Sequence, residues 1–267
     1  MPISFDTILA SMTLFAAPFL RLSAMMAVAP VFSAAGFNVR TRALFAVLIA
    51  ALVAPSLPAP PVDSLLSGAG VLMGVREIGV GLVLGFVVQM AFGAAVFAGQ
   101  AISMTMGLGF AMAVDPQNGV QVPVISQLYV ILATLLFLAL DGHLLLIAAV
   151  VESYQIIPIG VAGLPASSLS AVVALGTTVF AGGILLALPA LTALLLINVA
   201  FGIVTRTAPQ LNIFAVGFPV TIFAGLLIMF LVMPGFIEAL TQLIGASLQR
   251  GIGAFGSGGR VAEEQTG

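Results

Sequence analysis

The sequence lacks cysteine and lysine entirely, and it has a single histidine among its 267 residues. Without cysteine the chain can form no disulfide, no thiolate metal site and no cysteine nucleophile. One imidazole is too few for a metal centre built from several histidines. Seven arginines against nine acidic residues give a net charge of −2, which provides no basic surface for nucleic acid. We therefore expect no metal, no cofactor and no nucleic-acid partner.

Charge of either sign is also scarce. Only 6% of the residues are charged, whereas soluble domains carry roughly 25%. Hydrophobic residues make up 61% of the chain, so it cannot cover a soluble fold with polar side chains. The start of the chain has no basic segment and its first apolar run contains Arg21, so no cleavable signal peptide is expected. The composition predicts an all-α, polytopic integral membrane protein and excludes a water-soluble enzyme.

Six apolar stretches approach the length of about 20 residues that a helix needs to cross a bilayer. They are expected at residues 8–31, 43–57, 71–113, 126–151, 171–204 and 213–237. The third would be about 65 Å long as one helix, so we expect it to break near Gly99, with a helix at 75–98 and an irregular element beyond. Pro189 is expected to kink the fifth stretch. A short amphipathic piece at 238–250 and a flexible, glycine-rich tail at 251–267 are expected to follow.

Several charged residues interrupt these stretches, and such residues are functional candidates in a membrane protein. Arg21 is expected to face protein, with Glu77, Asp141 or Glu152 as its partner, and the sequence does not choose among them. Arg76 and Glu77 are expected to form an interfacial pair at the start of the third helix, where a carboxylate suits the positive end of the helix dipole.

A G-x-x-x-G pattern follows this pair at Gly81 and Gly85, and it predicts close packing of helices either within the chain or between chains.

Asp141 and His143 flank Gly142 within the fourth stretch. The spacing indicates a polar turn between two half-helices, and a proton relay is a second interpretation because histidine titrates near neutrality. With Glu152 the pair would suit a proton-coupled secondary transporter, which places charged residues in broken helices near the middle of the membrane.

The segment after the third helix is apolar but has a pattern that disfavours helix. Its glycines weaken any helix there, and an Asp-Pro pair would end one. Irregular backbone of this kind is not tolerated against lipid. Methionine side chains adapt their shape, so the segment could seal a pore, or it could be a re-entrant packing loop. The residues considered for the seal are Met104, Met106, Gly107, Gly109, Phe110, Met112, Asp115 and Pro116.

A polar break separates the last two apolar stretches. It contains Arg206, Pro209 and Asn212 and ends at Pro219, and proline and asparagine favour a fixed turn. The run from Asn198 to Pro219 resembles the signature of the FliR family, which belongs to the bacterial type III export apparatus. Other parts of the chain resemble the same family in order, over residues 8–240: Arg21 with 29–32 and 38–42, 76–79 with Gly81 and Gly85, 98–116, 141–143 and 152–160. The chain departs from the family pattern at Leu144, where a second histidine is frequent, and at Tyr154, where phenylalanine is common.

The resemblance implies a non-enzymatic subunit of the export gate. Its fold would resemble a fused FliP-like part, about residues 1–170, and a FliQ-like helical hairpin, about 171–250, within one helical domain at 1–250. Its partners would be FliP-like and FliQ-like subunits and an FlhB-like protein, in the flagellar basal body at the bacterial inner membrane. The family's central loop, here about 107–122, would plug a channel for unfolded flagellar proteins. A virulence-type export-gate subunit and the secondary transporter are the alternatives, whereas an intramembrane enzyme is disfavoured.

Overall fold

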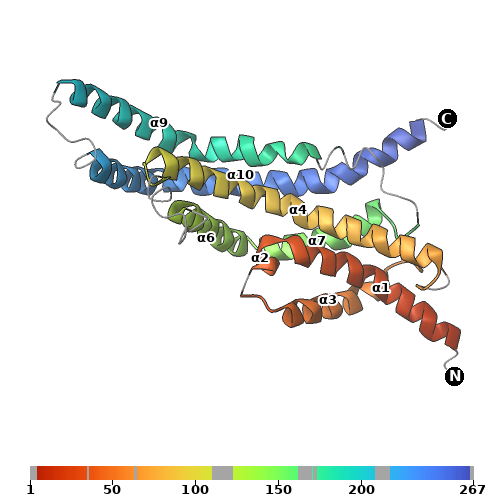
Figure 1. The fold of residues 1–267 in the computed structure, drawn as a ribbon. Helices are drawn as coiled ribbons and strands as arrows, with labels where there is room; N and C mark the ends of the chain where they lie inside the picture. Colours follow the sequence, from red (N-terminus) through yellow and green to blue (C-terminus); the bar gives the residue numbers. More distant parts are fainter. Residues whose placement is uncertain are drawn as a thin grey trace. The chain divides into compact units, whose positions relative to one another are not determined.

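The computed structural model describes residues 5–34, 36–62, 65–109, 123–161, 170, 173–207 and 217–264. All regular elements in these ranges are helices (Figure 1). They are α1 (Phe5–Val28), α2 (Pro30–Ser33), α3 (Val39–Val53), the short 3₁₀ helix η1 (Ala54–Ser56), α4 (Gly68–Thr105), α6 (Val124–Ala139), α7 (Gly142–Ile156), α9 (Thr177–Thr207) and α10 (Phe218–Glu264).

Five segments in the described part of the chain are long and apolar enough to cross a membrane, or six if the broken pair α6 and α7 forms one span. The prediction of an all-helical, multi-span membrane protein is therefore confirmed. The break between α6 and α7 falls at Asp141, where the sequence predicted a division of the fourth stretch. Asp141 adopts the left-handed conformation with φ of 54°, which aspartate tolerates better than most residues.

The predicted break of the third stretch near Gly99 is wrong, because α4 continues without interruption to Thr105. Gly99 serves a different purpose. A Cβ atom at this position would lie 2.5 Å from the Cα of Ser126, so glycine is required for α6 to approach α4. A glycine in a long apolar helix thus marks close packing here rather than a helix end.

The last two long helices are both continuous. α9 contains Pro189 within a single helix, and the expected kink at that proline stays a prediction. α10 does not end at residue 237 or 250 but continues to Glu264, into the segment expected to be a flexible tail. Its apolar window spans Pro219–Arg250.

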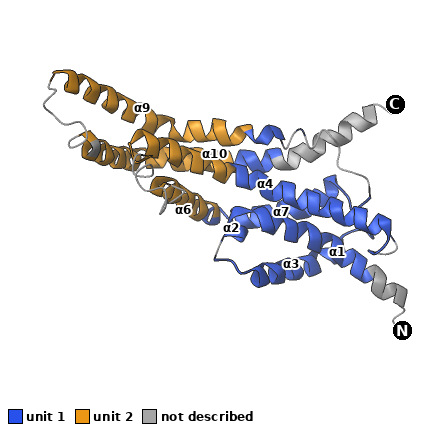
Figure 2. Cartoon of the chain, viewed as in Figure 1, with its two compact units in different colours: residues 1–90, 138–176, 245–267 blue, residues 91–137, 177–244 orange. Residues whose placement is uncertain are grey.

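The chain forms two compact units, shown in Figure 2. Unit 1 contains residues 1–90, 138–176 and 245–267, and unit 2 contains 91–137 and 177–244. This division follows contacts in space and does not test the predicted FliP-like and FliQ-like parts, which remain a prediction.

In unit 1, α1 packs closely along α4. A Cβ atom on Gly81 would collide with the backbone oxygen of Arg21, and one on Gly85 would lie 2.6 Å from the backbone oxygen of Met25. One helical turn along α4, from Gly81 to Gly85, corresponds to one turn along α1, from Arg21 to Met25. The two helices therefore run in the same direction. The G-x-x-x-G pattern is therefore used for packing within the chain.

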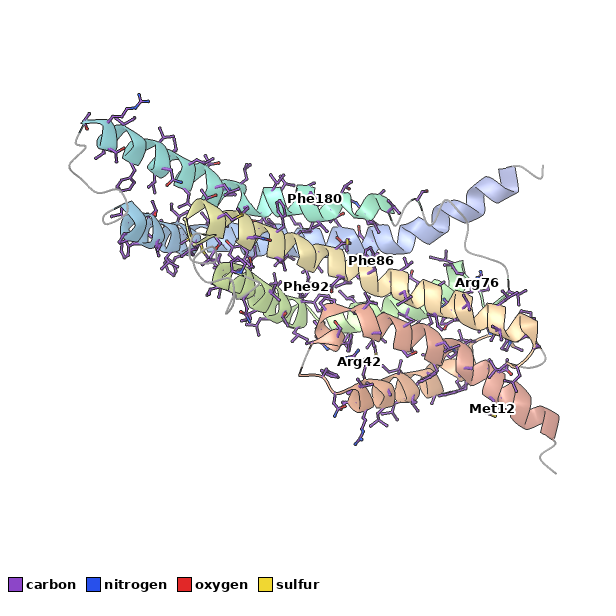
Figure 3. All side chains as sticks on the ribbon, in the orientation of Figure 1. Met12, Arg42, Arg76, Phe86, Phe92 and Phe180 are labelled. Carbon is purple, nitrogen blue, oxygen red and sulfur yellow. The ribbon has the colours of Figure 1, made fainter. Side chains whose placement is uncertain are left out.

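In unit 2, the end of α4 packs against α6, α9 and α10. The rings of Phe97 on α4 and Phe180 on α9, the second of which is labelled in Figure 3, meet edge to face at 5.6 Å. A Cβ atom on Gly183 would lie 2.6 Å from the Phe97 ring, so α9 approaches α4 through a glycine. Tyr129 of α6 meets Phe236 of α10 at 4.3 Å between ring centroids.

Candidate functional site

The buried arginine of α1 forms an extensive polar cluster in unit 1. Arg21 is completely buried, and its Nε donates to Glu77 Oε2 at 2.7 Å while Nη2 donates to Oε1 at 3.0 Å. Glu77 is also completely buried. The two bonds form the bidentate arrangement that suits a planar guanidinium and a carboxylate, and that a lysine could not reproduce. Of the three carboxylates considered as partners, the structure therefore selects Glu77.

Ser153 of α7 and Ile157, the residue after that helix, accept hydrogen bonds from further N–H groups of the guanidinium. Nη1 donates to the Ser153 hydroxyl at 2.7 Å, and Nη2 donates a second bond to the Ile157 carbonyl at 3.2 Å. The Tyr154 ring covers the guanidinium at 3.7 Å from its carbon, close enough for a cation–π interaction. With Glu77 these contacts use four of the five N–H donors of Arg21. The cluster joins α1, α4 and α7.

The expectation of an interfacial Arg76–Glu77 pair at a helix start is wrong. α4 begins at Gly68, so both residues lie inside the helix, and Glu77 is bonded to Arg21. Arg76, which is labelled in Figure 3, instead donates from Nη1 to the Pro158 carbonyl at 3.1 Å. A Cβ atom on Gly160 would lie 2.7 Å from that same Nη1, so glycine leaves space for the arginine.

The acidic and imidazole groups near the α6–α7 break are not joined into a relay in the described structure. Asp141 is exposed at the turn, and its backbone oxygen accepts the first bonds of α7 from Leu144 and Leu145. His143 is half-buried, and its Nδ1 has no hydrogen-bond partner among the described residues. Glu152 is exposed on α7, next to buried Ser153. This arrangement fits a polar turn.

The residues considered for a pore seal lie partly in the described structure. Met104 is exposed in the last turn of α4, whereas Met106, just after it, is buried. Gly107 lies in the turn that follows the helix, and Gly109 is helical again after that turn. Phe110, Met112, Asp115 and Pro116 lie outside the described residues.

The polar break after α9 is described only at its edges. Arg206 is exposed in the last turn of α9, where a cation suits the negative end of the helix dipole. Pro219 is exposed at the beginning of α10. Pro209 and Asn212 lie outside the described residues.

Sequence reasoning did not assign roles to several residues that the structure brings into contact. Ser153 and Tyr154 complete the arginine cluster from α7. Asn198 of α9 and Thr221 of α10 donate to backbone oxygens at the end of α4. The available signal was a polar side chain inside an apolar helix, because such side chains bond across helices in membrane proteins. That signal identifies the residues but not their partners.

No group of three or more histidine, cysteine, aspartate or glutamate side chains in the described ranges could hold a metal ion. The profile of bacterial export proteins, family 1, matches residues 12–247. Flagellar biosynthetic protein FliR of Escherichia coli strain K12 is 40% identical over 217 residues, covering 81% of this chain and 83% of that protein. FliR of Bacillus subtilis strain 168 is 31% identical over 207 residues, covering 76% and 80% of the two chains.

FliR of Caulobacter vibrioides is 32% identical over 221 residues, covering 81% of this chain and 87% of that protein. These bacteria are diverse and all three relatives carry a flagellar name, so the family assignment replaces the virulence and secondary-transporter alternatives. The chain therefore belongs to family 1 of the bacterial export proteins, as a FliR-type, multi-span and non-enzymatic membrane component of the flagellar export apparatus.

Proposed function

We propose that the chain is a subunit of the flagellar export gate, which forms a channel for unfolded flagellar proteins across the bacterial inner membrane. In this proposal it assembles with FliP-like and FliQ-like subunits and an FlhB-like protein in the basal body. Its family membership supports this role. The structural observation that supports it best is a set of apolar helices that are too long and too exposed for a free membrane bundle.

The length of α4 conflicts with an ordinary membrane crossing. Its 38 residues extend about 57 Å at 1.5 Å per residue. A helix tilted by 40°, the upper end of the usual range, needs only about 39 Å to cross a hydrocarbon core of about 30 Å. The whole of α4 is apolar enough to qualify as a span, so part of its apolar surface requires cover other than lipid.

The last two long helices, α9 and α10, also have apolar surface that the chain itself does not cover. Only 22% of the α9 window and 17% of the α10 window is buried within the chain. The α10 window has 32 residues and extends about 48 Å, again beyond a tilted crossing. Large apolar side chains such as Phe223 and Phe230 are more than 70% exposed on this helix. Contacts with sister subunits would cover these faces over their full length.

The segment that begins at Gly107 is proposed to plug the channel, with the exposed Met104 side chain beside it. Methionine can adapt to an irregular opening, because its side chain is unbranched and polarisable. Met106 contributes differently, since it is buried in unit 2 and cannot face a channel in this conformation.

Purification in mild detergent tests the assembly. We expect native mass spectrometry to detect this chain bound to FliP-like and FliQ-like subunits, because the exposed apolar faces would otherwise aggregate or bind detergent alone. The matched control is a variant with aspartate at both Phe223 and Phe230, which should be recovered without those subunits. Recovery of the native chain as a monodisperse single polypeptide would contradict the proposal.

A further inference from the structure

The end of α4 is fixed by a helix-terminating motif of its own backbone. Gly107 has φ of 83°, in the left-handed region that glycine enters freely. Its N–H donates to the Met104 carbonyl at 3.0 Å, and the Leu108 N–H donates to the Ser103 carbonyl at 3.1 Å. These two bonds define a Schellman motif, in which the chain reverses out of the helix and satisfies part of its final turn.

Side chains of two other helices donate hydrogen bonds to backbone carbonyls that have no partner within the motif. Asn198 of α9 donates from Nδ2 to the Thr105 carbonyl at 3.2 Å. Thr221 of α10 donates from Oγ1 to the Met106 carbonyl at 3.4 Å. The donors lie 93 and 115 residues from their acceptors, so the end of α4 is tied to the helices that flank the polar break.

A tight apolar contact supports these bonds. Met106 is 1% exposed and its side chain lies against Gly225 of α10. A Cβ atom on Gly225 would lie 2.6 Å from Cε, 2.7 Å from Cγ and 2.8 Å from Sδ of that methionine. All three distances are too short for carbon and sulfur atoms, so Met106 could not keep its position if residue 225 carried a side chain.

We propose that Met106, Asn198, Thr221 and Gly225 form an anchor that positions the start of the plug segment, an inference that rests on the proposed function. The anchor holds the chain up to Met106 on α9 and α10 and thereby fixes the position from which the segment starts, at Gly107. Asn198, Thr221 and Gly225 are positioning residues, because they act through the end of α4 and need not contact an exported protein.

The absence of cysteine permits a direct measurement of the anchor in the assembled complex. A single thiol introduced by Gly109→Cys reports the exposure of the segment, since a Cβ atom there would meet only Met104 Cγ, at 3.9 Å. Adding Gly225→Ala should raise the rate of maleimide labelling about fivefold, the factor that corresponds to loss of one net hydrogen bond.

Gly202→Ala and Gly235→Ala are matched controls, because a Cβ atom at either position meets nothing within 4 Å in this chain. They add the same helix propensity without displacing Met106, so labelling at position 109 should stay unchanged.

Two further variants keep the inference falsifiable if Gly225→Ala impairs assembly. Asn198→Leu and Thr221→Val each remove one donor while nearly preserving side-chain size, and each should also accelerate labelling, whereas Thr221→Ser should not.

Replacing Met106 by alanine removes all three atoms that meet the new Cβ, so Gly225→Ala combined with Met106→Ala should label more slowly than Gly225→Ala with Met106→Leu. Native labelling rates in all assembled anchor variants would overturn the anchor.

Ion leakage of the resting complex separates the anchor from the plug. Deleting residues 107–114 should leave the complex assembled but permeable to small ions, and Gly225→Ala should produce a smaller leak. Leakage in the deletion alone, with native labelling in the anchor variants, would overturn the anchor and leave the proposed plug intact. Faster labelling without leakage in any variant would support the anchor as a positioning device and overturn the plug.

Discussion

Arg21 illustrates how a single side chain organises unit 1. It is completely buried, and its bonds reach Glu77 on α4 and two positions at the end of α7. A buried ion pair adds little net stability compared with apolar residues of the same size, but removing one partner leaves a buried charge without compensation. The pair therefore specifies which faces of the helices meet, more than it contributes to the free energy of folding.

Truncating this arginine should be strongly destabilising. Arg21→Ala should cost about 3–5 kcal/mol, because Glu77 would remain buried and unpaired. Arg21→Lys should lie between the native protein and Arg21→Ala, since an ammonium keeps the charge but not the bidentate geometry. The measurement is the thermal unfolding midpoint of the purified complex, together with the amount of complex recovered.

The double variant Arg21→Met, Glu77→Leu serves as the control for charge. It removes both ions at once, so it should be more stable than Arg21→Ala alone. A double variant that is less stable than Arg21→Ala would contradict the unpaired Glu77 carboxylate as the source of the destabilisation.

At the scale of helices, glycine decides how closely pairs approach. Gly81 and Gly85 admit the backbone of α1, and Gly99 admits the backbone of α6. The G-x-x-x-G pattern of Gly81 and Gly85 predicted close packing, whereas Gly99 was predicted to be a helix break, because glycine lowers helix propensity by about 1 kcal/mol relative to alanine. Packing outweighs that cost here, so the glycines occur in helices that continue through them.

Two glycines of α4 provide a matched test of this interpretation. Gly81→Ala should destabilise the purified complex by about 1–3 kcal/mol, because the new methyl group would collide with the backbone of α1 and separate Arg21 from Glu77. Gly74→Ala should be neutral or stabilising, since its Cβ would make only an ordinary contact with Leu20 at 3.4 Å. Equal unfolding midpoints for the two variants would contradict close packing as the role of Gly81.

For the molecule as a whole, the exposed apolar surface is the property that demands explanation. α3, α9 and α10 each bury less than a quarter of their apolar windows within the chain. Lipid can cover a helix only over the thickness of the bilayer. The windows of α9 and α10, with 35 and 32 residues, exceed that thickness, and the proposed assembly would cover the remainder with neighbouring subunits.

Site-specific photo-crosslinking can distinguish protein from lipid at this surface. A photoreactive phenylalanine analogue at position 223 or 230 should form adducts with other subunits, because these side chains are 71% and 76% exposed. The same analogue in place of Phe236, which is 3% exposed against Tyr129, should crosslink within the chain. Lipid adducts alone at 223 and 230 would argue that these positions face the bilayer.

The sequence alone predicted the helical class, the number of spans and the division at Asp141, since these follow from composition and local backbone preferences. It could not select Glu77 over two other carboxylates for Arg21, because 56 residues separate the partners and only the packing of α1 on α4 brings them together. The lengths of α4 and α10 were underestimated for a related reason. Local rules count glycine as a helix breaker, whereas an apolar environment and tight helix contacts favour continued backbone hydrogen bonding.

The left-handed turn at Gly107 also has a genetic consequence. Every single-nucleotide missense change in a glycine codon introduces a residue with a Cβ atom, and such residues other than asparagine or aspartate tolerate this backbone poorly. The codon for residue 107 therefore has almost no neutral neighbours, whereas that for Gly202 can accept alanine without a clash. In a population of bacteria, neutral substitutions should therefore accumulate on the exposed helix surface long before residue 107 changes.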